Sequence, residues 1–92
     1  MRRHLYKTKY NWTTEDYDLM LWLQNGRCPI CKEHHTLFDR HLDIDHNHRT
    51  GRVRGLLCSG CNYVVGRYDN NILKDTELIE KIEDYLCFTL EI

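Results

Sequence analysis

Apolar positions in this 92-residue chain follow the period of a helix near each end of the sequence. In residues 13–26 they recur three and four positions apart, and Thr13 stands where a helix N-cap is expected. Gly26 is expected to end this helix, because glycine adopts the left-handed conformation at a helix C-terminus without strain. The second helical pattern covers residues 74–88.

The middle of the chain has the pattern of a β-hairpin. Apolar and acidic residues alternate over residues 42–45, as they do in a half-buried strand. Residues 53–57 read as the returning strand, and 49–52 as the turn between the two. A short helix is expected at 62–66, followed by a loop at 68–71. The pattern predicts an α+β domain in which two helices flank a hairpin.

Two pairs of cysteines enclose this hairpin: Cys28 with Cys31, and Cys58 with Cys61. A two-residue gap lets each pair bind one metal ion, and four thiolates complete a tetrahedral zinc site with no open position. The predicted zinc is therefore structural, which suits a chain too short for a large core. A disulfide framework is the alternative. It fits less well, because five cysteines are an odd number and the N-terminus lacks the apolar stretch of a signal peptide.

Three other residues are expected to serve the fold, with stacking of the tryptophans on nucleic acid and a reactive thiol at the cysteine as the less favoured alternatives. Trp12 and Trp22 should pack in the core, where large aromatic side chains contribute most. The fifth cysteine, Cys87, should act as a small, partly buried apolar residue near the end of the last helix.

A polar cluster between the cysteine pairs is the candidate catalytic site. Asp45 offers a hard carboxylate oxygen suited to Mg²⁺ or Mn²⁺, and His46 can take a proton from water near neutral pH. Asn62 follows the last cysteine pair and could supply a neutral second metal ligand. Three alternatives stay open: an ordinary polar loop at Asp45, a turn-forming role for Asn62, and zinc binding by His46 and His48.

Charge is distributed unevenly along the chain. Seven carboxylates and two lysines follow from Asp69 onward, so this segment carries −5 and the remainder +4, within a total of −1. The basic residues gather near the N-terminus and beside the hairpin turn, a distribution that can give a basic face for nucleic acid. No apolar run is long enough to span a membrane, so we expect a cytoplasmic protein with no membrane contact.

The central run resembles the recombination endonuclease VII family. Residues 45–48 read DHNH, residues 50–58 read TGRVRGLLC, and Asn62 directly follows Cys61. Members of this family are zinc-stabilised His-Asn-His (ββα-metal, or His-Me finger) nucleases, found largely in phages. The resemblance extends from the helix at Thr13 to Gly66.

The resemblance implies a role for each matched residue. Asp45 and Asn62 would bind a catalytic Mg²⁺ or Mn²⁺, His46 would be the general base, and His48 would assist at the phosphate. Hydrolysis of DNA would leave a 5′-phosphate and a 3′-hydroxyl. Three arginines beside the hairpin turn would hold flanking phosphates: Arg52, Arg54 and, as a weaker candidate, Arg49.

We therefore expect one domain over residues 1–92, with a basic arm at 1–12 and the zinc knuckles and ββα core at 28–67. The expected function is metal-dependent nicking of double-stranded or branched DNA by a monomer or weak homodimer. Val65 departs from the junction-resolving member, which has an acidic residue at that position. The alternative function is a non-catalytic zinc module that binds DNA or a protein partner.

Overall fold

The structure, a computed structural model, describes residues 12–47 and 49–87. His48 and nearly all of the expected basic arm lie outside these residues. The described elements follow one another as α2 (Thr14–Leu23), a 3₁₀ turn (His35–Leu37), β1 (Asp43–His46), β2 (Val53–Leu57), α3 (Ser59–Asp69) and α4 (Thr76–Cys87). The expected α+β class is confirmed.

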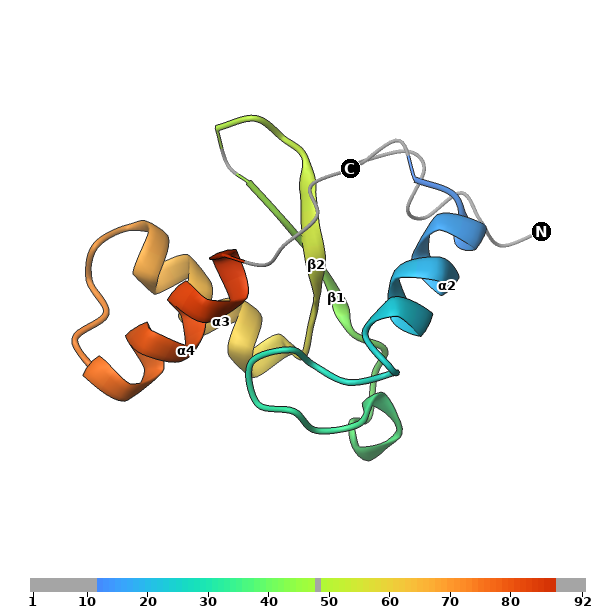
Figure 1. Ribbon diagram of the computed structural model, residues 1–92, viewed down its shortest axis with the longest axis horizontal. Coiled ribbons are helices and arrows are strands. Elements are labelled where there is room, and N and C mark those ends of the chain that lie inside the picture. Colours follow the sequence, from blue (N-terminus) through green and yellow to red (C-terminus); the bar gives the residue numbers. More distant parts are fainter. Residues whose placement is uncertain (1–11, 48, 88–92) are drawn as a thin grey trace.

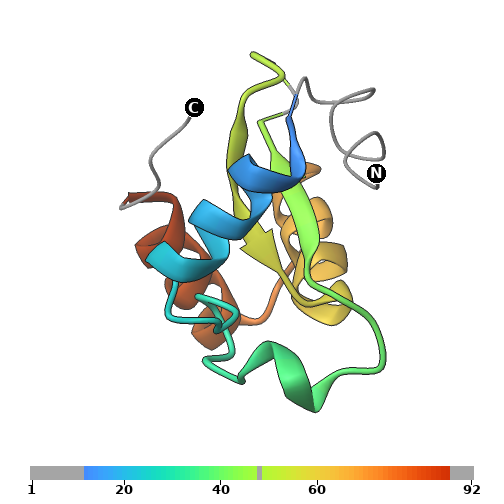
Figure 2. The same cartoon turned by 90° about the vertical axis from the view of Figure 1, so that its right-hand side faces the viewer.

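The hairpin of β1 and β2 lies between the helices. Helix α2 lies on one side of it, and α3 and α4 lie on the other (Figures 1 and 2). The strands are antiparallel, with Asp45 opposite Gly55 and His46 opposite Val53. The register therefore shifts between Asp45 and His46, and this irregularity leaves Arg54 as the extra residue on β2. Such a bulge re-aims the side chains beside it.

Helix α2 begins where the sequence indicates but ends at Leu23, three residues before Gly26, with Gln24 as its C-cap. Thr13 and Asp16 form a capping box, each side chain accepting a hydrogen bond from the other's backbone N–H. After the helix, Asn25 and Gly26 adopt φ angles of 58° and 71°, which turn the chain into the first cysteine pair.

Helix α2 is tied to the hairpin at two points. Tyr17 donates a 2.7 Å hydrogen bond to the carbonyl of Leu42. The side-chain amide of Gln24 accepts the N–H of Leu56 at 2.8 Å and donates to its C=O at 3.0 Å. It therefore pairs with β2 in the way that the backbone of a neighbouring strand would.

Helix α3 is longer than expected. Residues 62–66 were expected to be helical and 68–71 to form a loop, but the helix runs from Ser59 to Asp69. At its start, the Cys58 sulfur accepts the N–H of Cys61 and serves as the N-cap. At its end, the chain turns only at Asn71, where φ is 61°. Asp69 is therefore a helical residue.

Helix α4 begins at Thr76, after Asp75 has accepted hydrogen bonds from the N–H groups of Leu78 and Ile79. The core is formed by apolar residues of α2, β2, α3 and α4 together with loop residues such as Leu42. Its most deeply buried members include Leu42, Leu56, Leu57, Val65 and Ile82, none more than 1 % exposed.

Two expectations about individual side chains were wrong. Trp22 is 74 % exposed, whereas Trp12 is buried as expected. The buried face of α2 carries Tyr17 and Met20, and Trp22 lies about 200° around the helix from Met20. Cys87 is exposed rather than partly buried.

Candidate functional site

The four cysteines of the two knuckles come together in space. Their sulfur atoms all lie within 4.8 Å of one another, and those of Cys31 and Cys58 are 3.9 Å apart. Tetrahedral zinc with bonds of about 2.3 Å places its sulfurs about 3.8 Å apart. The cluster therefore has the ligand type, number and spacing that zinc requires.

Backbone geometry builds each half of the cluster. In the first knuckle, the backbone of Cys28 accepts the N–H of Lys32 at 2.8 Å and donates to Glu33 at 3.0 Å, while Lys32 adopts a positive φ of 70°. In the second knuckle, Cys58 caps α3 and Cys61 lies in its first turn.

The electrostatics of the cluster favour a cation. A hydrogen bond from Cys61 lowers the pKa of Cys28 to about 4, and this same contact, with burial, raises the pKa of Cys61. Burial also raises the pKa of Cys31. The thiolate of Cys28 thus forms at the expense of Cys61, and a bound cation would favour the ionised form of both.

Asp45, the first residue of the candidate catalytic cluster, lies in β1 and is 4 % exposed. Its carboxylate is held by a bidentate ion pair, in which Nε and Nη2 of Arg54 donate to Oδ2 and Oδ1 at 3.0 Å each. Oδ2 also accepts a 2.7 Å hydrogen bond from the hydroxyl of Tyr85 in α4. Three charge-assisted hydrogen bonds therefore fix this carboxylate.

Arg54 joins Asp45 to α3. Its Nη2 also donates to Oδ2 of Asp69 at 3.0 Å, so one nitrogen serves two carboxylates. Burial by itself lowers the pKa of Arg54, but the bonds and charges of Asp45 and Asp69 outweigh burial and raise it. The guanidinium is a permanent positive charge. Arg54 was expected to face DNA phosphates, but it is 7 % exposed and points into this network.

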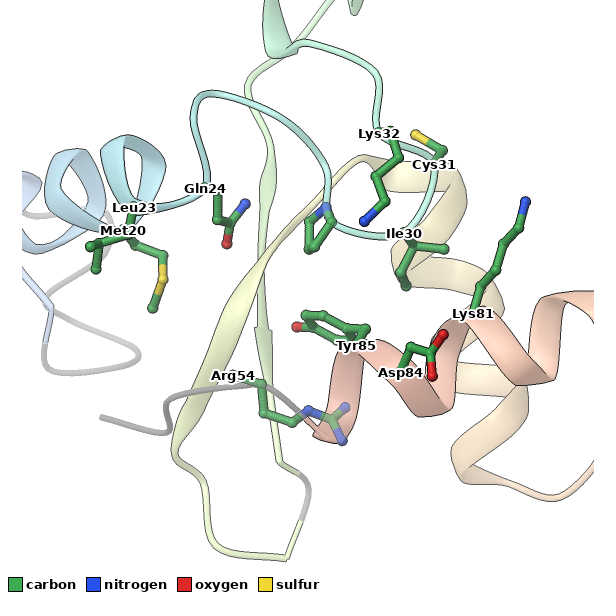
Figure 3. Close-up of a pocket in the computed structure, with 11 residues that line it drawn as sticks. Met20, Leu23, Gln24, Ile30, Cys31, Lys32, Arg54, Lys81, Asp84 and Tyr85 are labelled. Atoms are coloured by element: carbon green, nitrogen blue, oxygen red, sulfur yellow. The ribbon is translucent and has the colours of Figure 1, made fainter.

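Tyr85 acts as a neutral donor to Asp45. Burial raises its pKa well above the usual value near 10, and the adjacent negative charge of Asp45 raises it further. Tyr85 and Arg54 also line a cavity of about 630 Å³ between α2, the first knuckle and α4 (Figure 3).

The other expected site residues occupy separate places. His46 ends β1 and is half-buried, and Asn62 is half-buried in the first turn of α3. Among the described residues, no hydrogen bond joins Asn62 to Asp45, and the side-chain amide of Asn62 makes none. Asp69, the α3 residue that reaches the Asp45 network, lies about 10 Å further along the helix than Asn62. Arg49 and Arg52 are exposed at the hairpin turn.

The sequence did not indicate the roles of the three other residues in the Asp45 network. Arg54 was identified, but for a different role, and Asp69 was placed in a loop. Tyr85 was counted only as one apolar position of the last helix. The nearest signal in the sequence was Arg54 itself, a charged residue within an otherwise apolar strand, since a buried charge requires a partner.

The residues around Asp45 do not fit a divalent cation in the arrangement observed. Two of the three hydrogen bonds to its oxygens come from a guanidinium, whose positive charge repels a second cation. Asn62, the other expected ligand, is not bonded to it.

The fold and the clustered cysteines define the class of protein. It is a small α+β protein in which a hairpin is followed by a helix and four cysteines form a site suited to structural zinc. The sequence model described as "Recombination endonuclease VII" matches residues 3–87, and the chain belongs to this family. Family membership supports a nuclease.

Two phage proteins are similar to this chain. The Gene 59 protein of Mycobacterium phage D29 is 41 % identical over 78 residues, which cover 84 % of this chain and 44 % of that protein. The Gene 59 protein of Mycobacterium phage L5 is 45 % identical over 58 residues, covering 62 % of this chain and 35 % of that protein. The chain thus spans less than half the length of these relatives. No solved structure gave a significant match. Within the described residues, no helix has the length and apolarity needed to cross a membrane.

Proposed function

We propose that this protein is a DNA endonuclease of the His-Asn-His type that depends on Mg²⁺ or Mn²⁺ and nicks double-stranded or branched DNA. The observation that carries the proposal is the family match over residues 3–87, which includes Asp45, His46 and Asn62. A phage protein of this kind would act in the cytoplasm of the bacterial host, as a monomer or weak homodimer.

His46 is the general base in this proposal. Its imidazole takes a proton from a water molecule, which then attacks phosphorus in line with the departing 3′ oxygen. The products carry a 5′-phosphate and a 3′-hydroxyl. The metal would be held by Asp45 and Asn62. In this structure, the guanidinium of Arg54 occupies the carboxylate of Asp45.

DNA would be held by the exposed arginines of the hairpin turn. Arg52 and Arg49 are both solvent-accessible, and long cationic side chains there can reach phosphates on either side of the cut. We keep His48, which lies outside the described residues, as an assisting group at the phosphate.

Supercoiled plasmid tests the proposal. Zinc-loaded protein with Mg²⁺ or Mn²⁺ should convert it to open circles, and His46→Ala should slow this conversion about 10²–10⁴-fold. His41→Ala is the matched control, since it removes an exposed imidazole just before β1. A folded His46→Ala protein that nicks at the normal rate would contradict the assignment of the base. Direct linear product would indicate paired active sites.

A non-catalytic zinc module that binds DNA or protein is the second candidate. It is favoured because both oxygens of the Asp45 carboxylate already accept hydrogen bonds from Arg54 and Tyr85. Such a network can stabilise the fold without any catalytic role. DNA binding without cleavage under any divalent metal would support this candidate.

A further inference from the structure

The outer face of helix α3 carries an aromatic and a cationic side chain, Tyr63 and Arg67, one helical turn apart. We propose that these two side chains contact phosphates of the DNA backbone, Arg67 through its charge and Tyr63 through its hydroxyl. The inference rests on DNA as the substrate of the proposed function, and it adds a second contact surface to the arginines of the hairpin turn.

The helical period places both side chains opposite the core. Val65 is 1 % exposed and marks the buried side of α3. Tyr63 and Arg67 each lie about 160° around the helix from Val65, and Tyr63 is 66 % exposed. Cζ of Arg67 lies over the Tyr63 ring, 5.9 Å from its centroid. This cation–π contact holds the guanidinium at the surface of the helix.

Neither polar group has a protein partner within the part of the chain that the structure describes. The guanidinium of Arg67 makes no ion pair there, and the hydroxyl of Tyr63 makes no hydrogen bond. The carboxylate of α3, Asp69, is bonded to Arg54 instead. The donors of Tyr63 and Arg67 are therefore available to an anion from outside the protein.

The charges of the described helices make α3 the one suited to a polyanion. Helix α2 contains Glu15, Asp16 and Asp18 and no basic residue. Helix α4 contains four acidic residues and one lysine. Both of these helices repel the phosphates of DNA, whereas the cation on the outer face of α3 attracts them.

This face lies toward the arginines of the hairpin turn. Figure 1 shows α3 running back from the end of β2 toward the level of the turn. Nη2 of Arg54 donates to Asp69 at 3.0 Å, which fixes the last turn of α3 beside β2. Arg52 stands two residues before Arg54, about 7 Å along the chain, and Arg67 stands two residues before Asp69, about 3 Å along the helix. Arg52 and Arg67 thus lie near the same end of the hairpin, where one DNA duplex can contact both.

Gly66 leaves the helix surface bare between this pair and Asn62. It stands one turn after Asn62 and three residues after Tyr63. A Cβ added to Gly66 would meet no atom within 4 Å, so the space beside it is open. A DNA strand can approach the helix there, and arginine and tyrosine are side-chain types that position DNA through its phosphates.

Binding of zinc-loaded protein to a fluorescein-labelled duplex tests the proposal, by anisotropy at several salt concentrations without added Mg²⁺ or Mn²⁺. Arg67→Gln should lower the affinity about three- to tenfold and reduce the slope of log affinity against log salt by about 1. Tyr63→Phe should lower the affinity about two- to tenfold with the slope unchanged, because the lost hydroxyl is neutral.

Two control variants match these changes. Tyr68→Phe removes a hydroxyl from the same helix, one that bonds Glu83 of α4 at 3.0 Å. Lys81→Gln removes an exposed cation from α4. Both should bind the duplex within about twofold of wild type. Equal losses of affinity in the α3 variants and their controls would refute the proposed surface.

Plasmid nicking by the wild type separates this surface from the proposed function. If the wild type nicks while Arg67→Gln and Tyr63→Phe bind DNA normally, the α3 surface is refuted and the nuclease stands. If the two variants lose affinity as expected but no divalent metal gives nicking, the surface stands and the nuclease fails. A wild type that binds no DNA would overturn both.

Discussion

Tyr85 and Asp45, 40 positions apart in the sequence, are joined by a 2.7 Å hydrogen bond between a buried phenol and a buried carboxylate. This bond connects the last described helix to the candidate catalytic strand. Helix α4 is therefore part of the support of the site.

Tyr85→Phe should lower the free energy of unfolding by about 1.5–3 kcal/mol, the usual contribution of a hydrogen bond to a charged group. Urea unfolding of the zinc-loaded protein measures this loss. Tyr63→Phe is the matched control, because Tyr63 is 66 % exposed and its change should stay within about 0.5 kcal/mol. Equal values for the two variants would show that the bond to Asp45 contributes no stability.

Stability should fall above pH 10, and Tyr85 should account for part of this fall. The pKa of Tyr85 is near 10 in the unfolded chain and higher in the folded protein. The contribution of Tyr85 to the stability of the fold is fully present below pH 10. Above pH 10 the unfolded chain releases a proton that the folded protein keeps. The free energy of unfolding therefore falls by about 1.4 kcal/mol per pH unit. The difference in unfolding free energy between wild type and Tyr85→Phe should therefore narrow as pH rises from 10. A constant difference would refute this linkage.

Gly55→Ala should destabilise the fold by about 1–3 kcal/mol through crowding. A Cβ there would lie 2.9 Å from the Tyr85 hydroxyl and 3.2 Å from Oε1 of Gln24. Both atoms are fixed by hydrogen bonds, to Asp45 and to the N–H of Leu56. Thermal unfolding measures the effect.

Gly66→Ala is the control for this crowding, since nothing lies within 4 Å of its added methyl group. Alanine there should stabilise α3 by up to about 1 kcal/mol. A Gly55→Ala protein as stable as wild type would mean that the region around Tyr85 relaxes freely.

Cys58→Ser should abolish cooperative folding, because it removes a zinc ligand and alters the N-cap of α3. Circular dichroism and zinc content report the loss. Cys87→Ser, which changes an exposed cysteine outside the cluster, should retain one zinc per chain and the wild-type spectrum. A well-folded, zinc-free Cys58→Ser protein would contradict a structural role for the metal.

Arg52→Ala should weaken DNA binding equally for different sequences and reduce the slope of log affinity against log salt by about 1, the value for one lost phosphate contact. Fluorescence anisotropy at several salt concentrations measures both. Lys74→Ala, an exposed cation of the acidic C-terminal segment, should leave the slope unchanged. An unchanged slope for Arg52→Ala would show that Arg52 makes no phosphate contact.

Features encoded by short spacings could be predicted from the sequence. The cysteine pairs cluster as expected, and the returning strand at 53–57 was predicted with its correct bounds, because alternation and turn residues are local signals. The end of α3 was misplaced. The chain turns at Asn71 through a left-handed backbone conformation that asparagine permits but does not require, and Tyr68 and Asp69 tolerate either a helix or a loop.

The partners of Asp45 could not be predicted from local patterns. Arg54 faces it because of a bulge in the hairpin, and Tyr85 reaches it because α4 folds back over a separation of 40 residues. Neither contact produces a periodic pattern of residues that could be recognised in the sequence. The same limit applies to Trp22, whose exposure depends on which face of α2 meets the hairpin.

The four residues of the Asp45 network come from four successive elements, β1, β2, α3 and α4. During synthesis, the ribosome therefore releases the carboxylate long before it releases the phenol that completes its surroundings. A polypeptide interrupted between Asp69 and Tyr85 would carry both cysteine pairs and the polar run at 45–47, yet lack the final contact that orients Asp45. The surroundings of Asp45 are therefore complete only after α4 has been synthesised.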